Sequence, residues 1–336
     1  MRGFINRSGA IVGAIAALLA ALPVRAEVNE VRIAVQYGLV YLPVTVAEVD
    51  GFFAAQAKKA GLGELKVSVL RFSGSPAIND ALLSGNVEIG AYGAPALLTV
   101  WDKTRGRLDV HGLAALAAHP FILMTNKPAI KSFTDFGDED QIATPANSSP
   151  QAILMRMAAE KFFGPGQYQR IDKLLVSMPH PDATAALLSG RTISGYVATP
   201  PFIALLRKSD KIHEVIASKE ILGGGEATGN VLGAARKFVE ANPTVAKVVI
   251  AALEDAMAAI AKDPDRAADI YIKSESAKIS KEEVLGMLAD GTMVYSVAPS
   301  GLLKFARFMA RTGGLKNEPK SWQDVFFPLL AGRNGS

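Results

Sequence analysis

The sequence of 336 residues contains no cysteine. That absence excludes disulfide bonds, zinc sites with thiolate ligands, iron–sulfur clusters and cysteine nucleophiles. Histidine is scarce, with four residues and no spacing typical of a metal site. The chain also lacks a Gly-x-Ser-x-Gly elbow and a Gly-Lys-Ser/Thr phosphate loop. We therefore expect no metal, no cofactor and no catalytic activity.

Residues 1–26 differ in composition from the rest of the chain. They contain three arginines and no acidic residue, and residues 10–22 form an apolar run. Small residues precede Glu27 at the positions typical of a cleavage site. We therefore expect a secretory signal peptide cleaved near Ala26, and a periplasmic protein. A membrane anchor is the alternative, but the run is shorter than the ~20 residues that span a bilayer.

The chain after the predicted signal is nearly neutral. The formal charge of the whole sequence is +4, and it falls to +1 without residues 1–26, because 33 basic residues then face 32 acidic ones. This balance gives no electrostatic reason to bind nucleic acid or an anionic membrane, and we expect neither partner. No later stretch has the length and apolar composition of a membrane span.

Short β-type runs alternate with helical segments along the first half of the chain. The spacing predicts strands over 31–35, 65–72 and 87–90 and a helix over 44–60. A second helix is predicted from Ser75 as N-cap, with proline at its first position. Further helices are predicted after residue 234. Strands separated by helices favour an α/β fold with mostly parallel sheets.

One segment of the chain occurs twice. Residues 76–97 and 181–202 share eight identities at an offset of 105 residues, beginning with Pro76 and Pro181. Each copy has the pattern of a helix, a short strand and a second helix. A chance likeness between two common units is the alternative, but identities at Gly and Pro positions disfavour it. The long period predicts two similar lobes rather than a solenoid.

The repeat suggests where the lobes begin and end. We expect a first lobe over 27–120, a second lobe over 121–224, and a return to the first lobe with C-terminal helices over 225–336. Lys127-Pro128 and the glycine run 223–225 are the candidate crossings between the lobes.

The order of several motifs resembles one family. The chain is similar to the solute-binding proteins of ABC importers in the nitrate-, sulfonate- and taurine-binding group, which includes relatives that bind thiamine-pyrimidine precursors. The matching segments are 31–35, 48–53, 72–76, 83–90, 93–96, 147–150, 179–183 and 198–201. The resemblance implies a type II periplasmic-binding fold, in which two hinged lobes close over a solute. It also implies a monomer that delivers the solute to an ABC permease in the inner membrane.

Candidate ligand contacts follow the carboxyl ends of the predicted strands, where loops lead into helices. Backbone N–H groups and the positive ends of helices favour a small anion or a carbonyl oxygen there. Each candidate also has a plainer role, since serines cap helices, tyrosines pack and asparagine makes turns. The candidates are Tyr37, Gly38, Tyr41, Ser73, Gly74, Ser75, Tyr92, Gly93, Asn147, Ser148, Ser149 and Thr199.

Three other side chains lie near the expected cleft. Arg71 could neutralise an anion or point to solvent, whereas His119 and His180 are of a kind that is more often structural than functional. The predicted cleft loops contain no unambiguous Arg or Lys. An anion would therefore depend on N–H groups, hydroxyls and helix dipoles.

The resemblance implies a sulfonate, taurine, nitrate or related small organic anion as the solute. A neutral aromatic or pyrimidine solute stacked on the tyrosines is one alternative. A module that presents its closed form to a sensor protein is another. An enzyme similar to thiamine-pyrimidine synthases is disfavoured, because those carry a cysteine-rich iron site and this chain has no cysteine.

Overall fold

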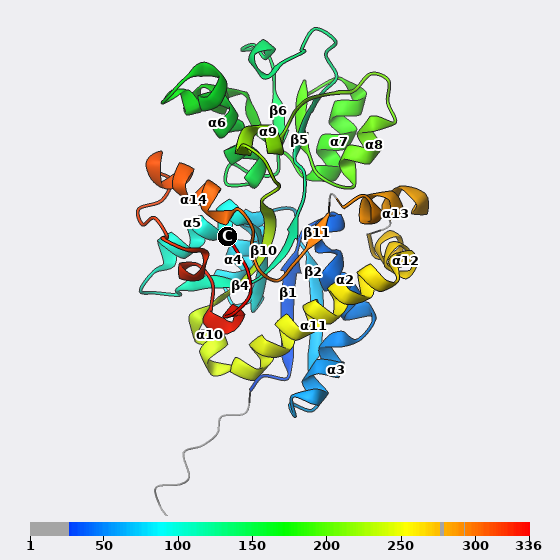
Figure 1. The fold of residues 1–336 in the computed structure, drawn as a ribbon, viewed down its shortest axis with the longest axis vertical. Helices are drawn as coiled ribbons and strands as arrows, with labels where there is room; N and C mark the ends of the chain where they lie inside the picture. Colours follow the sequence, from blue (N-terminus) through cyan, green and yellow to red (C-terminus); the bar gives the residue numbers. More distant parts are fainter. Residues whose placement is uncertain (1–26, 276–278, 292) are drawn as a thin grey trace, which may run out of the picture.

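The computed structural model describes residues 27–336 except 276–278 and 292 (Figure 1). The predicted signal peptide over 1–26 lies outside the described residues. The chain forms two α/β lobes, each built on one sheet and stacked along the vertical axis of Figure 1. We call the lobe with the six-stranded sheet the first lobe, and the lobe with the five-stranded sheet the second lobe.

The sheet of the first lobe is mixed, with two parallel and three antiparallel pairings, whereas mostly parallel sheets were predicted. Its strand order is β11-β4-β10-β3-β1-β2. β1 pairs in parallel with β2 and β3, whereas β10 pairs antiparallel with β3 and β4. All residues of β3 and β4 are buried, as expected of strands covered by helices on both faces. The strands are β1 (Glu30–Val35), β2 (Lys66–Arg71), β3 (Ile89–Gly93), β4 (Val110–Ala118), β10 (Thr228–Ala235) and β11 (Val294–Tyr295).

Within the described residues, nine helices surround this sheet. One of them has six residues, and the others have eight to twenty. The predicted helix over 44–60 is two helices, because Gly51 takes a left-handed conformation (φ 72°) and breaks it. The long helix α11 packs on α2 and α3 across the front of this lobe (Figure 1). The helices are α2 (Leu42–Val49), α3 (Phe52–Lys59), α4 (Ser75–Leu83), α5 (Ala94–Thr104), α10 (Arg236–Ala241), α11 (Pro243–Lys262), α12 (Pro264–Glu275), α13 (Lys281–Ala289) and α14 (Leu302–Arg311).

The sheet of the second lobe has the order β7-β6-β8-β5-β9. Its strands are β5 (Ile122–Thr125), β6 (Ile142–Thr144), β7 (Leu175–Ser177), β8 (Gly195–Ala198) and β9 (His213–Ala217). Its helices are α6 (Pro150–Phe163), α7 (His180–Ser189), α8 (Phe202–Arg207) and α9 (Ser218–Leu222). Short 3-10 turns complete the chain at η1 (Leu39–Tyr41), η2 (Phe133–Asp135), η3 (Gln167–Leu174), η4 (Trp322–Asp324) and η5 (Pro328–Leu330).

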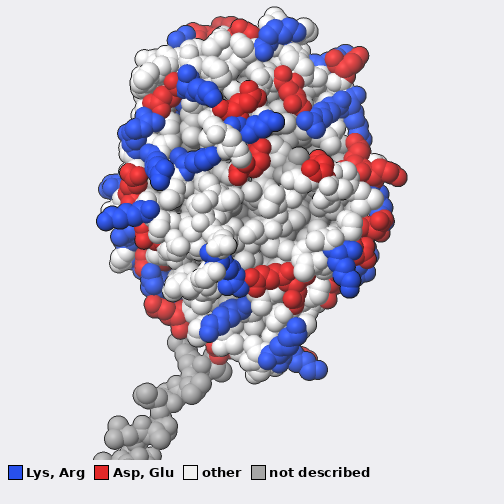
Figure 2. All heavy atoms as spheres, in the orientation of Figure 1, with Lys and Arg blue, Asp and Glu red and all other residues white. Residues whose placement is uncertain are grey.

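The surface carries both signs of charge. Figure 2 shows Lys and Arg intermixed with Asp and Glu over the face it presents, without a large area of one sign. This distribution matches the nearly balanced composition of the chain after residue 26. Between residues 27 and 336, leaving out the four that are not described, no helix is long and apolar enough to cross a membrane.

The sequence repeat occupies equivalent places in the two sheets. β3 lies between a parallel neighbour, β1, and an antiparallel one, β10. β8 likewise lies between β6, which is parallel, and β5, which is antiparallel. The helices that precede them end with the same bond, from Ser84 Oγ to the Ala81 carbonyl (3.2 Å) and from Ser189 Oγ to the Ala186 carbonyl (2.9 Å). The prediction of two similar lobes is confirmed.

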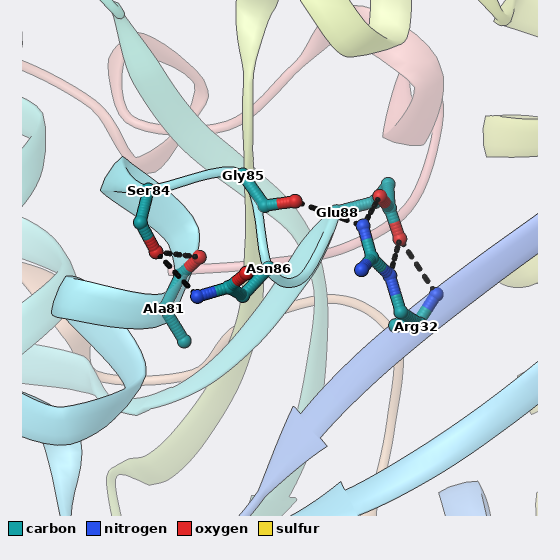
Figure 3. A network of polar contacts seen from close by, with 6 residues as sticks. All are labelled: Arg32, Ala81, Ser84, Gly85, Asn86 and Glu88. Carbon is teal, nitrogen blue, oxygen red and sulfur yellow. Dashed lines mark hydrogen bonds and ion pairs between the residues drawn. The ribbon is translucent and has the colours of Figure 1, made fainter.

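A neighbouring side chain holds the turn that follows each of these helices. In the first lobe, Arg32 donates to the Gly85 carbonyl (2.8 Å) and to Glu88 Oε1 (2.5 Å), as Figure 3 shows. In the second lobe, the Asn126 amide donates to the carbonyls of Leu187 (2.9 Å) and Ile193 (3.1 Å). These bonds hold the turn before β3 in the first lobe and the turn before β8 in the second.

Two segments cross between the lobes, and we call them the crossing segments. Residues 119–121 join β4 to β5, and residues 218–227 join β9 to β10. The glycine run 223–225 lies in the second, as predicted. The crossing expected at Lys127-Pro128 is wrong, because these residues lie between β5 and β6, within the second lobe.

The crossing segments are bonded to each other. The Phe121 N–H donates to Ser218 Oγ (3.0 Å), and the Ser218 N–H donates to the Phe121 carbonyl (2.8 Å). Ser218 Oγ in turn donates to Glu226 (2.7 Å), and burial raises the pKa of that carboxyl group. The two connections therefore form one joined element between the lobes.

Candidate functional site

A small cavity lies between the two lobes. Its volume is about 20 Å³, which leaves room for about one water molecule. The lobes are therefore closed against each other around it. Its polar lining residues are Gln36, Ser75, Ser149, Gln151, Thr199 and Asn230, and its aromatic ones are Tyr37, Tyr41, Phe121 and His180.

Glycines of the first lobe face prolines of the second around this cavity. A Cβ atom on Gly38 would lie 3.6 Å from the Pro200 carbonyl oxygen, and one on Gly74 would lie 3.7 Å from that of Pro145. These are ordinary contact distances. At Gly93 the lobes approach so closely that a side chain would clash with Pro150. The absence of a side chain at this third position lets the lobes close.

Ion pairs join the lobes at the outer edges of the contact. Arg311 of α14 donates to both carboxylate oxygens of Glu160 on α6, at 2.8 Å for Nη1. Lys208, after α8, lies 2.6 Å from Glu283 of α13. Arg311 lowers the pKa of Glu160, and Lys208 contributes to lowering that of Glu283. These pairs stabilise the closed arrangement of the lobes.

Four helices begin at the cavity wall. α4 starts at Ser75, α5 follows Gly93, α6 follows Ser149, and α7 starts at His180. The first N–H groups of a helix have no partner within it, and the helix dipole places partial positive charge at this end. The cavity is therefore surrounded by weak positive potential from both lobes.

Neutral groups supply the rest of the polar lining. None of the described residues on the cavity wall is Asp, Glu, Lys or Arg. In the first lobe, the Gln36 amide donates to Ser75 Oγ (3.4 Å), and the Asn230 amide lies between the Tyr41 hydroxyl (2.7 Å) and His119 Nε2 (3.1 Å). Burial raises the pKa of Tyr41, which therefore remains protonated, and lowers that of His119.

The second lobe contributes a serine, an amide and an imidazole. Ser149 Oγ accepts from the Ala152 N–H (3.2 Å) as the N-cap of α6. Gln151 lies two residues later, and its amide nitrogen is 3.4 Å from His180 Nε2. Burial, with a smaller contribution from His119, lowers the pKa of His180 to about 3. The His180 ring is therefore uncharged near neutral pH.

An ion pair lies behind the first-lobe loop. Arg71 Nη2 is 3.7 Å from Glu275, whose side chain is 6% exposed. The Glu275 carboxylate also accepts from the Gly38 N–H (3.0 Å). Burial raises the pKa of Glu275 more than Arg71 lowers it. The charge of Arg71 is thus directed at Glu275, not at the cavity.

A larger groove of about 690 Å³ lies beside the crossing segments, between α8 and α13. Acidic and basic residues both line it, among them Arg207, Glu214, Lys219 and Glu226. None of the α4 to α7 helix starts lies on its wall. We place the candidate site in the smaller cavity, because the helix N-termini of both lobes meet there. Among the residues that the structure describes, no group of three His, Asp or Glu could hold a metal ion.

The structure brings half of the predicted site residues to the cavity. Tyr37, Tyr41, Ser75, Gly93, Ser149 and Thr199 lie on its wall. Gly38 and Gly74 lie next to it at the contact between the lobes. Ser73 and Asn147 are exposed and Ser148 is half-buried, and the Asn147 carbonyl accepts from Arg156 Nη1 (2.8 Å).

Two expectations about these residues are corrected. Tyr92 does not face the cleft, because alternation along β3 turns its ring into the core of the first lobe, where its hydroxyl lies near Gly90. Ser75 is the first residue of α4 and not its N-cap. Gly74 holds the cap position, and Ser75 Oγ accepts from Gln36 instead.

Gln36, Gln151 and Asn230 are not among the sequence-predicted ligand contacts, and His180 was expected near the cleft but in a structural role. A signal for His180 was present, because it stands 105 residues after Ser75 and both residues precede the helix proline of a repeat copy. Gln151 follows the Ser149-Pro150 helix start. Asn230 has no local signal, since it lies 189 residues from the Tyr41 hydroxyl that it contacts.

Solved structures of low sequence identity share this fold. The ligand-binding component of an ABC-type import system from Staphylococcus aureus, with zinc bound, is 17% identical, with a TM-score of 0.70 over 91% of this chain and 99% of that chain. The alkanesulfonate-binding protein SsuA of Xanthomonas axonopodis pv. citri, bound to MOPS, is 15% identical, with a TM-score of 0.69 over 90% and 98%. The periplasmic nitrate-binding protein NrtA of Synechocystis is 16% identical, with a TM-score of 0.67 over 89% and 85%.

These likenesses confirm the expected periplasmic-binding-protein fold. No curated protein sequence matches the chain. The family model of the NMT1-like family matches residues 25–272, which is well over half of the sequence and covers the second lobe and most of the first. The chain therefore belongs to the NMT1-like family.

Proposed function

We propose that this protein is the solute-binding component of an ABC import system and that it binds a small organic anion between its lobes. One observation carries the proposal. The N-termini of α4, α5, α6 and α7 meet at the interlobe cavity, and none of the described residues on its wall is acidic. Unpaired N–H groups and helix dipoles favour an anion at such a place. The names of the structural neighbours, which include sulfonate- and nitrate-binding proteins, support a small anion as the solute.

The mechanism is opening and closing of the lobes without covalent chemistry. A cavity of about 20 Å³ admits no sulfonate or carboxylate until the lobes separate. The crossing segments are the places where such a rotation would occur. A solute that contacts both walls favours a closed form in which the lobes stand far enough apart to hold it, and it shifts the equilibrium from the open form toward that form. The closed form then docks on the permease, and the protein acts as a monomer in the periplasm after cleavage near Ala26.

A thermal-unfolding screen of the purified protein tests the proposal. The panel contains alkane- and arylsulfonates, taurine, nitrate, short carboxylates and pyrimidines. A ligand at 100 times its Kd adds about 2.7 kcal/mol to the free energy of unfolding, which shifts the midpoint by several degrees. A higher midpoint with one of the anions supports the proposal. If none of the anions raises the midpoint, the proposal is contradicted.

A matched pair of variants tests whether the anion binds in this cavity. Ser75 is buried at the cavity, whereas Ser73 is exposed two residues earlier. We expect Ser75→Ala to weaken binding of the anion severalfold, because it removes a hydroxyl from the wall. Ser73→Ala should leave the affinity unchanged. Equal effects of both variants would contradict binding in this cavity.

A neutral aromatic solute is the second candidate. Tyr37, Tyr41 and Phe121 are aromatic residues of the cavity wall, and the polar groups beside them are uncharged amides and hydroxyls. Amides both donate and accept hydrogen bonds, which suits a neutral heterocycle. Stabilisation by pyrimidines but not by anions would favour this candidate.

A further inference from the structure

The contacts of His180 indicate which ring nitrogen carries its hydrogen. Its Nδ1 contacts the Tyr196 hydroxyl, and its Nε2 faces the amide nitrogen of Gln151 (3.4 Å). An amide nitrogen can donate a hydrogen bond but cannot accept one, so Nε2 is the acceptor from Gln151. The ring hydrogen is then on Nδ1, which donates to the Tyr196 hydroxyl.

This proton position leaves His180 Nε2 as an acceptor. Burial lowers the pKa of His180 to about 3, so the ring carries a single hydrogen near neutral pH, and that hydrogen is on Nδ1. The amide nitrogen of Gln151 lies 3.4 Å from His180 Nε2 and donates a hydrogen bond to it.

The Gln151 carbonyl oxygen is then free at the cavity. Gln151 is 3% exposed, and its Oε1 has no hydrogen-bond partner among the described residues. A buried acceptor that stays unpaired after a solute binds is unfavourable. A well-matched solute therefore supplies an N–H or O–H group to this oxygen.

The charge of that donor follows from the rest of the wall. An ammonium group would need an acidic partner, but the described residues on the wall include none. It would also face the positive ends of four helices. A hydroxyl or amide N–H satisfies Gln151 without adding a buried positive charge.

We propose that Gln151 makes this site selective for small anions that also carry a neutral O–H or amide N–H donor. The inference rests on the proposed function, since it assumes that an anion occupies the cavity. The helix N-termini hold the anionic group, and Gln151 recognises the donor. Anions without a donor leave the amide oxygen unpaired, and anions with an ammonium group lack an acidic partner.

Matched solutes test this selectivity by titration calorimetry on the whole protein. The sulfonate set is hydroxyethanesulfonate, ethanesulfonate and taurine, and the carboxylate set is glycolate, acetate and glycine. We expect the hydroxy compound of a set that binds to have about tenfold higher affinity than the other two. Binding of these anions without that preference overturns the inference but leaves the proposed function standing. Binding of none of them overturns the proposed function.

Variants connect the preference to Gln151. Gln151→Met keeps the length of the side chain and removes the amide, so the affinity ratio within a set should fall to about one. Gln151→Glu keeps acceptor oxygens and adds a negative charge, so the preference should move toward taurine or glycine. Gln167→Met changes an exposed glutamine away from the cavity and is the matched control. An unchanged ratio in folded Gln151→Met, or an unmoved preference in Gln151→Glu, contradicts the assignment.

Discussion

A Cβ atom on Gly93 would clash with Cδ of Pro150, so the two lobes touch at a point where a side chain does not fit. Gly93 ends β3 in the first lobe, and Pro150 begins α6 in the second. The backbone of Gly93 (φ −63°, ψ 141°) is accessible to any residue. The glycine is therefore needed for the approach of the lobes and not for its own conformation.

Gly93→Ala should weaken solute binding without unfolding the protein. The extra methyl group meets Pro150 only when the lobes close, and overpacking of this kind costs about 1–3 kcal/mol. A closed form destabilised by this amount should have about tenfold lower affinity for the solute, and titration calorimetry measures the difference. Gly74→Ala is the control, because its Cβ would lie 3.7 Å from Pro145 O and its backbone is extended. Equal losses in both variants would show that closure at Gly93 is not the cause.

Ser149→Ala should lower both stability and affinity, whereas Ser280→Ala should lower stability alone. Each serine oxygen accepts an N-cap bond of 3.2 Å, from Ala152 and Glu283 respectively. Loss of either cap costs ~1 kcal/mol of unfolding free energy. Ser149 also lies on the cavity wall. Denaturant unfolding and calorimetry on both variants separate the two effects. An unchanged affinity in Ser149→Ala would remove this residue from the binding site.

Arg311→Gln should weaken binding by up to about fivefold, because the Arg311–Glu160 pair joins the lobes in the closed form. The effect should shrink as salt is raised, since Arg311 is 57% exposed. Lys173→Gln removes a pair with Asp138 that lies within the second lobe, so the affinity should stay the same. Affinity measured at low and high salt checks both expectations. Equal salt dependence of the wild type and Arg311→Gln would argue against this role.

His111→Asn should reduce the loss of stability in mild acid. Burial lowers the pKa of His111 to about 4, below its ordinary value of about 6.5. As the pH falls, the unfolded chain therefore gains a proton on His111 before the folded chain does. The contribution of neutral His111 to the free energy of unfolding is complete above about pH 6.5 and is lost as the pH falls toward 4. His119 and His180, whose pKa values are also lowered, act with the same sign.

The thermal midpoint at about pH 7 and about pH 4.5 measures this effect. Asparagine keeps an amide near the Nδ1 position, which lies 3.3 Å from the Asp109 carbonyl, but has no proton to gain. The variant should lose several degrees less than the wild type between the two conditions. An equal loss would show that protonation of His111 does not destabilise the fold.

Local patterns predicted most of the secondary structure. The strands near 31–35 and 65–72 and the helices after residue 234 were found close to their observed positions, because periodicity and caps act over a few residues. The helix over 44–60 was wrong because one left-handed glycine, Gly51, divides it. The crossing at Lys127-Pro128 was wrong because a strand end and a lobe boundary give the same local signal.

The site could be predicted only in part. Loops after parallel strands indicated Ser75, Gly93 and Ser149, which do lie on the cavity wall. Tyr92 was misplaced because strand ends were identified without knowing which face of β3 meets the other lobe. Whether the predicted residues bind a solute stays a prediction that the experiments above test.

The sequence by itself determined that there are two similar lobes, that each contains parallel strands followed by proline-started helices, and that thiolate chemistry is excluded. The tertiary structure alone decided which side chains share the cavity. His180 and Gln151 come from one lobe and Asn230 returns from far along the chain to the other. Helices and turns depend on contacts between near neighbours in sequence. A site between two lobes depends on the packing of distant segments, for which no short stretch of sequence carries a signal.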